Sequence, residues 1–314
     1  MTRSLFRIFF ILLIASLSTG CFTGIESTPK ITANDVKKEK VVVTAEQLYL
    51  DSIGNTTFSQ WRAGKRFYVT DNKINLIFGA TANPGDSLAG KVITYNGYDT
   101  ATDITGEQTT DIVFTSPEGK EYVYRINASV EELNRRSSID VPFTIEESLV
   151  AQTSQKLIGN KYYVTTSVWY DFNDEIAYGR KFIPVKIVDV QPGNHVYPVK
   201  LTFEDSNGKK ARLFLSVGNG YKSPRSFATL FSFTDPKLKY PEITDNVWNN
   251  IINGHVTLDM TGDECRLSLG SPKEIDRRPG YSGVRELWVY ENGTYLIFED
   301  GLLREFRNAN IRRQ

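Results

Sequence analysis

An internal repeat limits the possible fold more than any other feature of the sequence. The segment GKRFYV at positions 64–69 returns as GNKYYV at positions 159–164. A second pair of segments, IVFTSPEGK at 112–120 and LTFEDSNGK at 201–209, follows in the same order. Self-similarity at a fixed spacing indicates that one folding unit is present twice.

Each copy is predicted to open with a short helix, over residues 44–53 in the first copy and 145–157 in the second. Thr44 and Gln47 have the spacing of a capping box, and Gly54 suits the position after the last turn. About four alternating strands should follow each helix.

The last two strands of each copy are expected to form a hairpin, over residues 117–119 in the first copy and 206–208 in the second. We therefore predict two tandem small β-barrels or curled sheets of SH3-like type. Their expected bounds are residues 44–140 and 141–222.

A different pattern begins after a boundary marked by Pro224, Pro236 and Pro241. Two short helices are predicted, each starting at a threonine cap, Thr244 and Thr261. Three strands should follow, at residues 286–290, 294–299 and 302–306. Tight-turn dipeptides separate them, Asn292-Gly293 and Asp300-Gly301.

The pattern after the boundary predicts an α+β domain over residues 240–314, in which two helices cover a three-stranded antiparallel meander. The whole chain should therefore be mainly β. Within the meander, period-two geometry places Trp288 and Tyr290 on one face, and we expect Trp288 to be a core residue.

The second of these helices has unusually complete end signals. Thr261 and Glu264 form a capping box, and Met260 can pack on Cys265 as a hydrophobic staple. Gly270 suits the left-handed position after the last turn. Because Cys265 occupies a position that requires a small apolar side chain, we interpret it as a buried, unreactive thiol.

The N-terminus has the organisation of a secretory signal peptide. Arg3 and Arg7 accompany an apolar run at residues 5–15, which is too short to span a membrane as a helix. Small residues follow, and we assign residues 1–20 to the signal. Residues 21–43 are polar and without apolar periodicity, and we predict that they form a flexible tether.

The junction Leu17-Ser18-Thr19-Gly20-Cys21 resembles the lipobox of bacterial lipoproteins, although Ser18 stands where that family usually has leucine. The resemblance implies that Cys21 carries lipid, including palmitate, and that the chain is held to a membrane through this anchor. The alternative is an ordinary signal peptide with an incidental cysteine. Phe22 follows the cysteine instead of the aspartate that favours inner-membrane retention, so the resemblance implies the outer membrane. The periplasmic face is expected, and the cell surface stays open.

Charge and cysteine content exclude several classes of function. Loss of residues 1–20 removes two of 37 basic residues, so 35 remain beside 37 acidic ones. A near-neutral chain lacks the basic patch that binding nucleic acid requires. With Cys21 lipidated, Cys265 has no partner for a disulfide. No spacing of cysteine or histidine indicates a metal site, and no cofactor is expected.

Catalysis is not indicated by the residues present. His195 and His255 are the two histidines of the chain, and each lies beside a turn or helix end. Hydrolysis of glycans by a pair of carboxylates is left open, because sequence alone does not show which acids lie together. We predict that the chain is not an enzyme.

Residues 244–308 contain, in this order, the helix predicted to start at Thr244, the segment "DMTGDECRLSLGSP" and the segment "ELWVYENGTYLIFEDGLL". This arrangement resembles the SmpA/OmlA (BamE-like) domain of small outer-membrane lipoproteins. Asp259 stands where that family has glycine, and Cys265 where it has valine. The resemblance implies a non-catalytic module that docks on envelope proteins, such as the machinery that inserts outer-membrane β-barrels.

We therefore predict a docking or scaffold lipoprotein whose partner is an envelope or outer-membrane protein. A lipoprotein that binds carbohydrate or another ligand is the alternative. The polar segment 276–283 is the expected contact loop, with Arg277, Arg278 and Tyr281 as partner-binding residues. The competing interpretation of this segment is a solvated connection.

Overall fold

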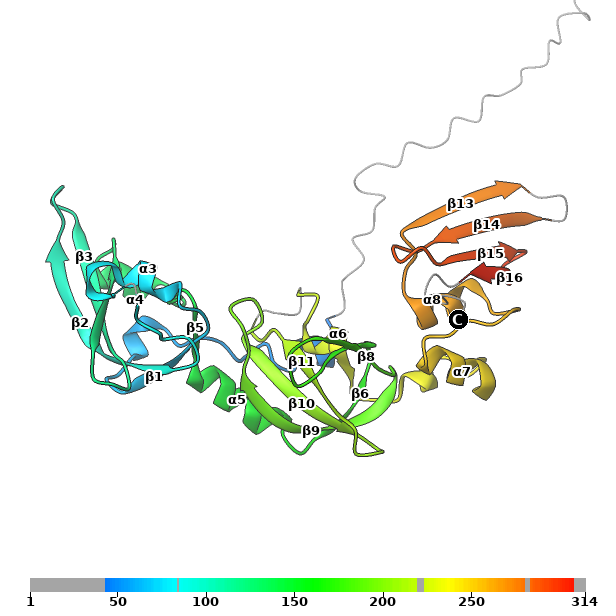
Figure 1. Cartoon of the computed structure of the whole chain (residues 1–314), viewed down its shortest axis with the longest axis horizontal. Helices are drawn as coiled ribbons and strands as arrows, with labels where there is room; N and C mark the ends of the chain where they lie inside the picture. The colour runs from blue at the N-terminus through cyan, green and yellow to red at the C-terminus, as the bar shows by residue number, and fades with distance from the viewer. Residues whose placement is uncertain (1–42, 84, 219–222, 280–282, 308–314) are drawn as a thin grey trace, which may run out of the picture. The chain divides into compact units, whose positions relative to one another are not determined.

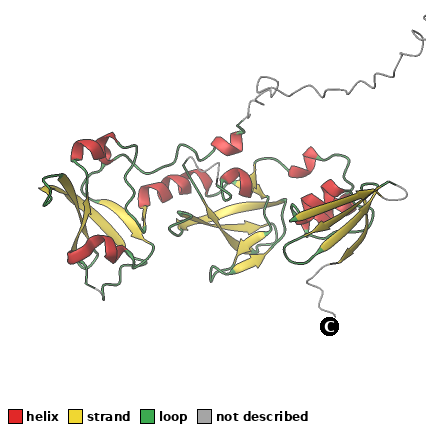
Figure 2. Cartoon of the chain, turned by 90° about the horizontal axis from the view of Figure 1, so that it is seen from above, coloured by secondary structure: helices red, strands yellow, loops and turns green. Residues whose placement is uncertain are grey.

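The computed structural model describes residues 43–83, 85–218, 223–279 and 283–307 of the 314-residue chain. Strands dominate this part of the chain and form three antiparallel sheets of five, seven and four strands (Figures 1 and 2). The predicted mainly β fold is confirmed. The predicted signal peptide, the lipid-attachment residue Cys21 and all of the tether except Val43 lie outside the described residues.

The first sheet has the strand order β4-β3-β2-β1-β5. Its strands are β1 (Lys65–Val69), β2 (Val92–Thr102), β3 (Gln108–Thr115), β4 (Glu121–Ile126) and β5 (Thr144–Glu146). Every second residue faces a buried core, as Phe67 and Val69 of β1 and Ile112 and Phe114 of β3 show. The accompanying helical segments are η1 (Phe58–Gln60), α3 (Ile74–Phe78), η2 (Gly79–Thr81) and α4 (Val130–Arg135).

The second sheet has the strand order β12-β6-β9-β10-β11-β7-β8. Its strands are β6 (Lys161–Val164), β7 (Val168–Tyr170), β8 (Ile176–Tyr178), β9 (Ile183–Pro192), β10 (Val199–Asp205), β11 (Lys210–Leu215) and β12 (Phe231–Ser232). Helix α5 (Glu147–Leu157) packs against β9, and Leu149 and Leu157 of α5 join the core of this sheet.

The two sheets repeat one arrangement of strands. The order β1-β2-β3-β4 in the first sheet corresponds to β6-β9-β10-β11 in the second. A short edge strand, β5 or β12, pairs with the first strand of each set, and a short helix, α4 or α6 (Phe227–Leu230), precedes that edge strand. Both predicted hairpins are present, with Gly119 and Gly208 at positive φ of 84° and 78°.

The N-terminal segment belongs to the second core, which corrects the predicted start of the first copy. Thr44 and Gln47 form the predicted capping box, but α2 covers only Ala45–Leu48. Leu50 and Ile53 then pack in the core of the second sheet. Tyr49 extends this contact, because its hydroxyl donates to the carbonyl of Lys156 at 3.0 Å and lies 2.9 Å from the hydroxyl of Tyr162.

A glycine in the loop after β11 permits this contact. Gly218 has a φ of 65°, and its amide donates to the carbonyl of Leu50. A Cβ at Gly218 would lie 2.3 Å from the carbonyl oxygen of Ile53. The first copy is therefore inserted between residues 44–53 and the rest of the second copy, instead of preceding it.

The predicted boundaries of the second copy are also corrected. Strand β5 pairs with β1, so the first sheet extends to Glu146 and past the predicted end at residue 140. Helix α6 and strand β12 follow the predicted end at residue 222 but pack with the second sheet. The sequence gives no sign of these elements because each is only two to four residues long.

The C-terminal part contains the two predicted helices, α7 (Asp245–Ile252) and α8 (Gly262–Leu269), after a 3-10 turn, η4 (Pro236–Lys239). The Thr261–Glu264 capping box is present, with distances of 3.3 Å and 2.7 Å for its two hydrogen bonds. Met260 and Cys265 are both buried in the same core, as the predicted staple requires. The interpretation of Cys265 as a buried thiol is confirmed.

The C-terminal sheet has four strands in the order β13-β14-β15-β16, so the predicted three-stranded meander is incomplete. Its strands are β13 (Glu274–Pro279), β14 (Val284–Val289), β15 (Tyr295–Glu299) and β16 (Leu302–Arg307). Asp300 and Gly301 both have positive φ, as a type I′ turn requires, whereas of Asn292 and Gly293 only the glycine does. The inner face of the sheet carries Trp288, which is 2 % exposed, and the prediction that it is a core residue is confirmed.

Candidate functional site

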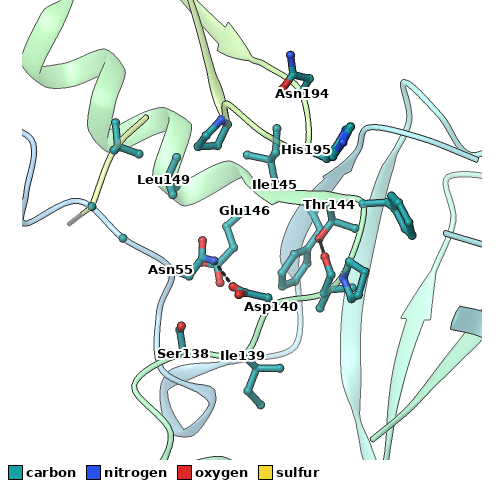
Figure 3. Close-up of a pocket in the computed structure, with 18 of the residues that line it drawn as sticks. Asn55, Ser138, Ile139, Asp140, Thr144, Ile145, Glu146, Leu149, Asn194 and His195 are labelled. Carbon is teal, nitrogen blue, oxygen red and sulfur yellow. Dashed lines mark hydrogen bonds between the residues drawn. The ribbon is translucent and has the colours of Figure 1, made fainter. Parts of the chain in front are cut away.

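A cleft of about 520 Å³ lies beside the segment Ser137–Glu146 that completes the first sheet. Residues from the second copy form its other side, including Asn194 and His195 in the loop between β9 and β10 (Figure 3). Most of its labelled side chains are polar. The further lining residues used below are Asn55, Asp140, Phe143, Thr144 and Glu146.

Glu146 is the most deeply buried charged residue of this cleft, at 3 % exposure. Its Oε2 atom accepts a hydrogen bond from Lys65 Nζ at 2.5 Å, and further bonds from Thr56 and from Ser148 Oγ. Its Oε1 atom is buried and has no hydrogen-bond partner among the described residues. A buried carboxylate oxygen without a partner is costly, so Oε1 is an unsatisfied acceptor in the wall of the cleft.

Lys65 neutralises the charge of Glu146. Its side chain is 12 % exposed, and Nζ also donates to Thr56 Oγ1 at 2.7 Å. The rings of Trp61 and Phe67 lie 5.5 and 5.2 Å from Nζ and complete its surroundings. Strand pairing fixes this geometry, because β1 carries Lys65 and β5, which carries Glu146, pairs with β1.

The rim of the cleft presents hydrogen-bonding groups with fixed positions. Asn55 Nδ2 donates to Asp140 Oδ1 at 3.0 Å, and Thr144 Oγ1 donates to the carbonyl of Val141 (Figure 3). Asn194 Oδ1 accepts from the amides of Val196 and Tyr197, which holds the loop on the opposite side. Such a set of amide, carboxylate and hydroxyl groups can bind a ligand rich in hydroxyl or amino groups.

Backbone strain is present in the lining segment. Phe143 has a φ of 61°, which is uncommon for a bulky residue. Thr70 holds this conformation, since its amide and its hydroxyl both donate to the carbonyl of Phe143, at 2.8 and 3.0 Å. Strain of this kind persists where surrounding contacts enforce it, and it is often found at binding sites.

His195 lies at the exposed edge of the cleft. Asp71, an acid of the first copy, has a lowered pKa. The main cause is the hydrogen bond from the backbone amide of Lys73, and the charge of His195 makes a smaller contribution. The structure thus brings His195 near an acid of the first copy. No hydrogen bond joins His195 to either carboxylate of the cleft among the described residues.

Two of the three predicted partner-binding residues lie in a strand. Arg277 and Arg278 are on strand β13, which corrects the prediction that residues 276–283 form a loop. Arg277 Nε donates to Glu286 Oε1 at 2.9 Å, and Arg278 Nη2 donates to Asp276 Oδ2 at 2.7 Å. Tyr281, the third predicted residue, lies outside the described residues.

No pattern in the sequence indicated the Lys65–Glu146 pair. Lys65 lies inside the repeated GKRFYV segment, but the second copy has Asn160 at the matching position. Glu146 stands at the start of α5, where an acid is common at a helix N-terminus for local reasons. Only the register between β1 and β5 brings the two residues together.

No model of a known protein family matches this chain, and no similar protein was found among curated proteins or solved structures. Within the described residues there is no group of three or more histidine, cysteine, aspartate or glutamate side chains placed to hold a metal ion. None of the helices in the same residues is both long and apolar enough to cross a membrane.

Proposed function

We propose that this chain is a lipid-anchored lipoprotein of the bacterial outer membrane that acts without catalysis, as a docking or scaffold component for an envelope protein. The lipobox-like junction at Cys21 and the polar segment after it support the anchor. The finer fold assignment belongs to the same proposal: two SH3-like units and a C-terminal module of SmpA/OmlA type. Strand β13 adds a fourth strand to the three-stranded meander that we predicted for this chain, and it is a further departure from the family's pattern.

The outer face of the C-terminal sheet is the observation that carries the docking function. Cross-strand register places Leu287 opposite Ile297, and Val289 opposite Tyr295, on the face away from Trp288. Leu287 is 37 % exposed, and the other three are partly exposed. Charged residues surround this apolar centre on the same face: Asp276, Arg278, Arg285, Glu299 and Glu305. An apolar centre with a charged rim is typical of a protein interface.

Arg277, Arg278 and Tyr281 remain our proposed partner-binding residues. Arg278 lies on the outer face together with Leu287, because it pairs with Arg285 across the strands. Arg277 lies on the other side of β13, where Glu286 neutralises it. Replacing both arginines with alanine should weaken partner binding mainly through Arg278.

Site-specific photo-crosslinking in intact envelopes tests the docking surface. A photoreactive residue at Leu287 should capture a discrete protein, and the double substitution Arg277→Ala, Arg278→Ala should reduce the yield. The matched control is the same photoreactive residue at Ile104, a fully exposed apolar position in the first sheet's β2–β3 hairpin. Equal adducts from both positions, or none from Leu287, would contradict the proposed surface.

The anchor is tested separately by fractionation. Cys21→Ser should move the chain from the membrane fraction to the soluble fraction, because several acyl chains provide firm anchoring and none would remain. Mass spectrometry of the wild-type N-terminal peptide should show the mass of the lipid. A Cys21→Ser chain that stays in the membrane fraction, with no lipid on the wild type, would exclude the anchor.

Ligand binding is the second candidate function, and the polar rim of the cleft beside Glu146 favours it. The hydroxyl groups of a carbohydrate can form hydrogen bonds with Asn55 and Asp140 at this rim. The cleft volume of about 520 Å³ is within the range of small-ligand sites.

Titration with soluble oligosaccharides, followed by ligand-observed NMR, tests this second function. Asn55→Ala and Asp140→Asn change only the rim and should weaken binding, whereas Glu131→Gln, an exposed acid of the first copy, should not. If no oligosaccharide binds, or if Glu131→Gln weakens binding equally, the cleft is not a carbohydrate site. Release of new sugar ends during the titration would instead support the hydrolysis that the sequence left open.

A further inference from the structure

Lys181 is a buried cation without a carboxylate partner in the described part of the chain. It lies two residues before the start of β9 and is 8 % exposed. Its Nζ atom donates to the carbonyl of Ser268 at 2.6 Å, and the ring of Phe182 lies 5.4 Å away. An ammonium group has three N–H donors, and among the described residues this carbonyl is the one acceptor found for them. A buried charge needs compensation by an opposite charge or by further hydrogen bonds.

Arg225 is a second cation at the same place, and it too forms no ion pair with a described acid. Its Nη2 atom donates to Tyr170 Oη at 2.9 Å, and its Nη1 atom to the carbonyl of Phe214 at 3.5 Å. The guanidinium also lies over the rings of Tyr170 and Tyr197, at 5.0 and 5.6 Å. These contacts fix the orientation of the side chain and leave its charge uncompensated.

Both cations line one cleft of about 470 Å³, beside the loop between β6 and β7. The lining contains no aspartate or glutamate. It adds hydroxyl groups and apolar groups to the two cations: Thr165, Thr166, Ser167 and Thr229, then Val168, Leu230 and Leu269. In the cleft of Glu146, by contrast, the buried Lys65 is neutralised by the protein itself.

We propose that this second cleft binds a small organic anion, through a phosphate or carboxylate group held by Lys181 and Arg225 and an apolar body held by Leu230 and Leu269. Charge-assisted hydrogen bonds from two cations of this kind are strong and directional. Because Lys181 is buried, the oxyanion has to enter the cleft. A free small molecule can do this, whereas the headgroup plane of a bilayer cannot.

The competing role for Lys181 is a purely structural one, as a hydrogen-bonded link to Ser268. Its backbone amide also donates to the carbonyl of Ile252, at 3.2 Å, which Lys181→Met would preserve. The two roles predict opposite effects of Lys181→Met in the absence of ligand. Loss of an uncompensated buried charge leaves stability unchanged or raises it, whereas loss of a required link lowers it.

The experiment measures thermal unfolding of the purified full-length chain in buffer that contains chloride as its only anion. Phenyl phosphate is the probe, and inorganic phosphate tests the oxyanion without an apolar body. A ligand at free concentration c that binds only the folded state stabilises it by RT ln(1 + c/Kd), so Tm rises with the logarithm of the ligand concentration above Kd. Wild type should show a Tm that rises with phenyl phosphate concentration in this way, and a weaker response to inorganic phosphate.

Lys181→Met and Arg225→Gln should each raise the Kd for phenyl phosphate by at least about tenfold, as expected for loss of a hydrogen bond to a charged group. Lys186→Met is the matched control, because Lys186 is an exposed lysine on β9. The Kd of this variant for phenyl phosphate should equal that of wild type. Arg225→Gln keeps the test informative if Lys181→Met fails to fold.

Three results would overturn the proposal. The first is the absence of a response to both phosphates at millimolar concentration. The second is an equal response in wild type, Lys181→Met and Arg225→Gln. The third is stabilisation by phosphatidylglycerol vesicles, dependent on Lys181, without any response to phenyl phosphate, since this would make a lipid headgroup the ligand.

Discussion

Replacing Trp288 with alanine is the most direct test of how the C-terminal module is held together. The Trp288 ring lies against Phe298, with 4.5 Å between ring centroids, and the guanidinium of Arg266 lies 4.3 Å from the ring centre. Trp288 Nε1 donates to Glu286 Oε2 at 2.8 Å. A Cβ built on Gly262 would meet the ring at 3.0 Å, which shows how closely the start of α8 approaches it.

The expected cost follows from these contacts. Removal of a buried tryptophan side chain costs about 3 to 5 kcal/mol through lost burial and a cavity. That range already includes most of the free energy of the contact between Trp288 and Phe298. The cation–π contact with Arg266 adds less than about 1 kcal/mol. We expect a loss of about 4 kcal/mol, which is a large part of the total stability of a small module.

Hydrogen exchange of the β15 amides is the appropriate assay, because the described residues form three separate cores and a single unfolding curve would mix them. In Trp288→Ala, protection of β15 should fall by the equivalent of about 4 kcal/mol, while protection of β3 in the first sheet stays unchanged. Leu287→Ala is the matched control, because Leu287 is the neighbouring residue on the outer face and should cost under about 1 kcal/mol.

Two results would refute this reasoning. If Trp288→Ala left β15 protection within about 1 kcal/mol of wild type, the ring would not be part of the core. If Leu287→Ala and Trp288→Ala had equal effects, the assignment of inner and outer faces from the strand register would be wrong.

Three further predictions concern other parts of the chain. Burial raises the pKa of Cys265 to about 12, so a thiol reagent at pH 8 should modify it only after unfolding; rapid labelling of the folded chain would contradict this. Burial lowers the pKa of Lys181 from 10.5 to about 8, so the unfolded state binds this proton more tightly than the folded state does. The stability of wild type relative to Lys181→Met should therefore rise between pH 8 and 10.5, by up to about 3 kcal/mol in urea titrations without phosphate. A fall in relative stability over this range would contradict the prediction. Tyr49→Phe should lower the free energy of unfolding by about 1 kcal/mol and reduce the hydrogen-exchange protection of the β6 amides. A loss of protection confined to β1 would mean that residues 44–53 pack on the first sheet.

Local signals in the sequence located many elements correctly. Thr261, Glu264 and Gly270 defined α8 because a capping box and a left-handed glycine depend on residues only a few positions apart. The hairpins at Gly119 and Gly208 were equally clear, since a tight turn needs positive φ at a known position. The repeat of strands followed from these same signals, because they occur twice in the same order.

Strand β13 was missed because its residues carry little apolar alternation. Five of its six residues are exposed or nearly so, and it is attached to the sheet by backbone pairing with β14 at one edge. An edge strand with arginine and proline side chains has the composition of a polar loop. Arg277 and Arg278 could therefore be identified as exposed from the sequence, but the element that carries them could not.

The sequence by itself determined the repeat, the short helices and the tight turns, because each depends on residues that are neighbours along the chain. Only the tertiary structure decided that residues 44–53 join the second core, that Glu146 meets Lys65, and that Lys181 and Arg225 share a cleft without an acid. These contacts join residues that are tens of positions apart. Their formation depends on strand register and core packing across the whole fold, and no short pattern of residues encodes them.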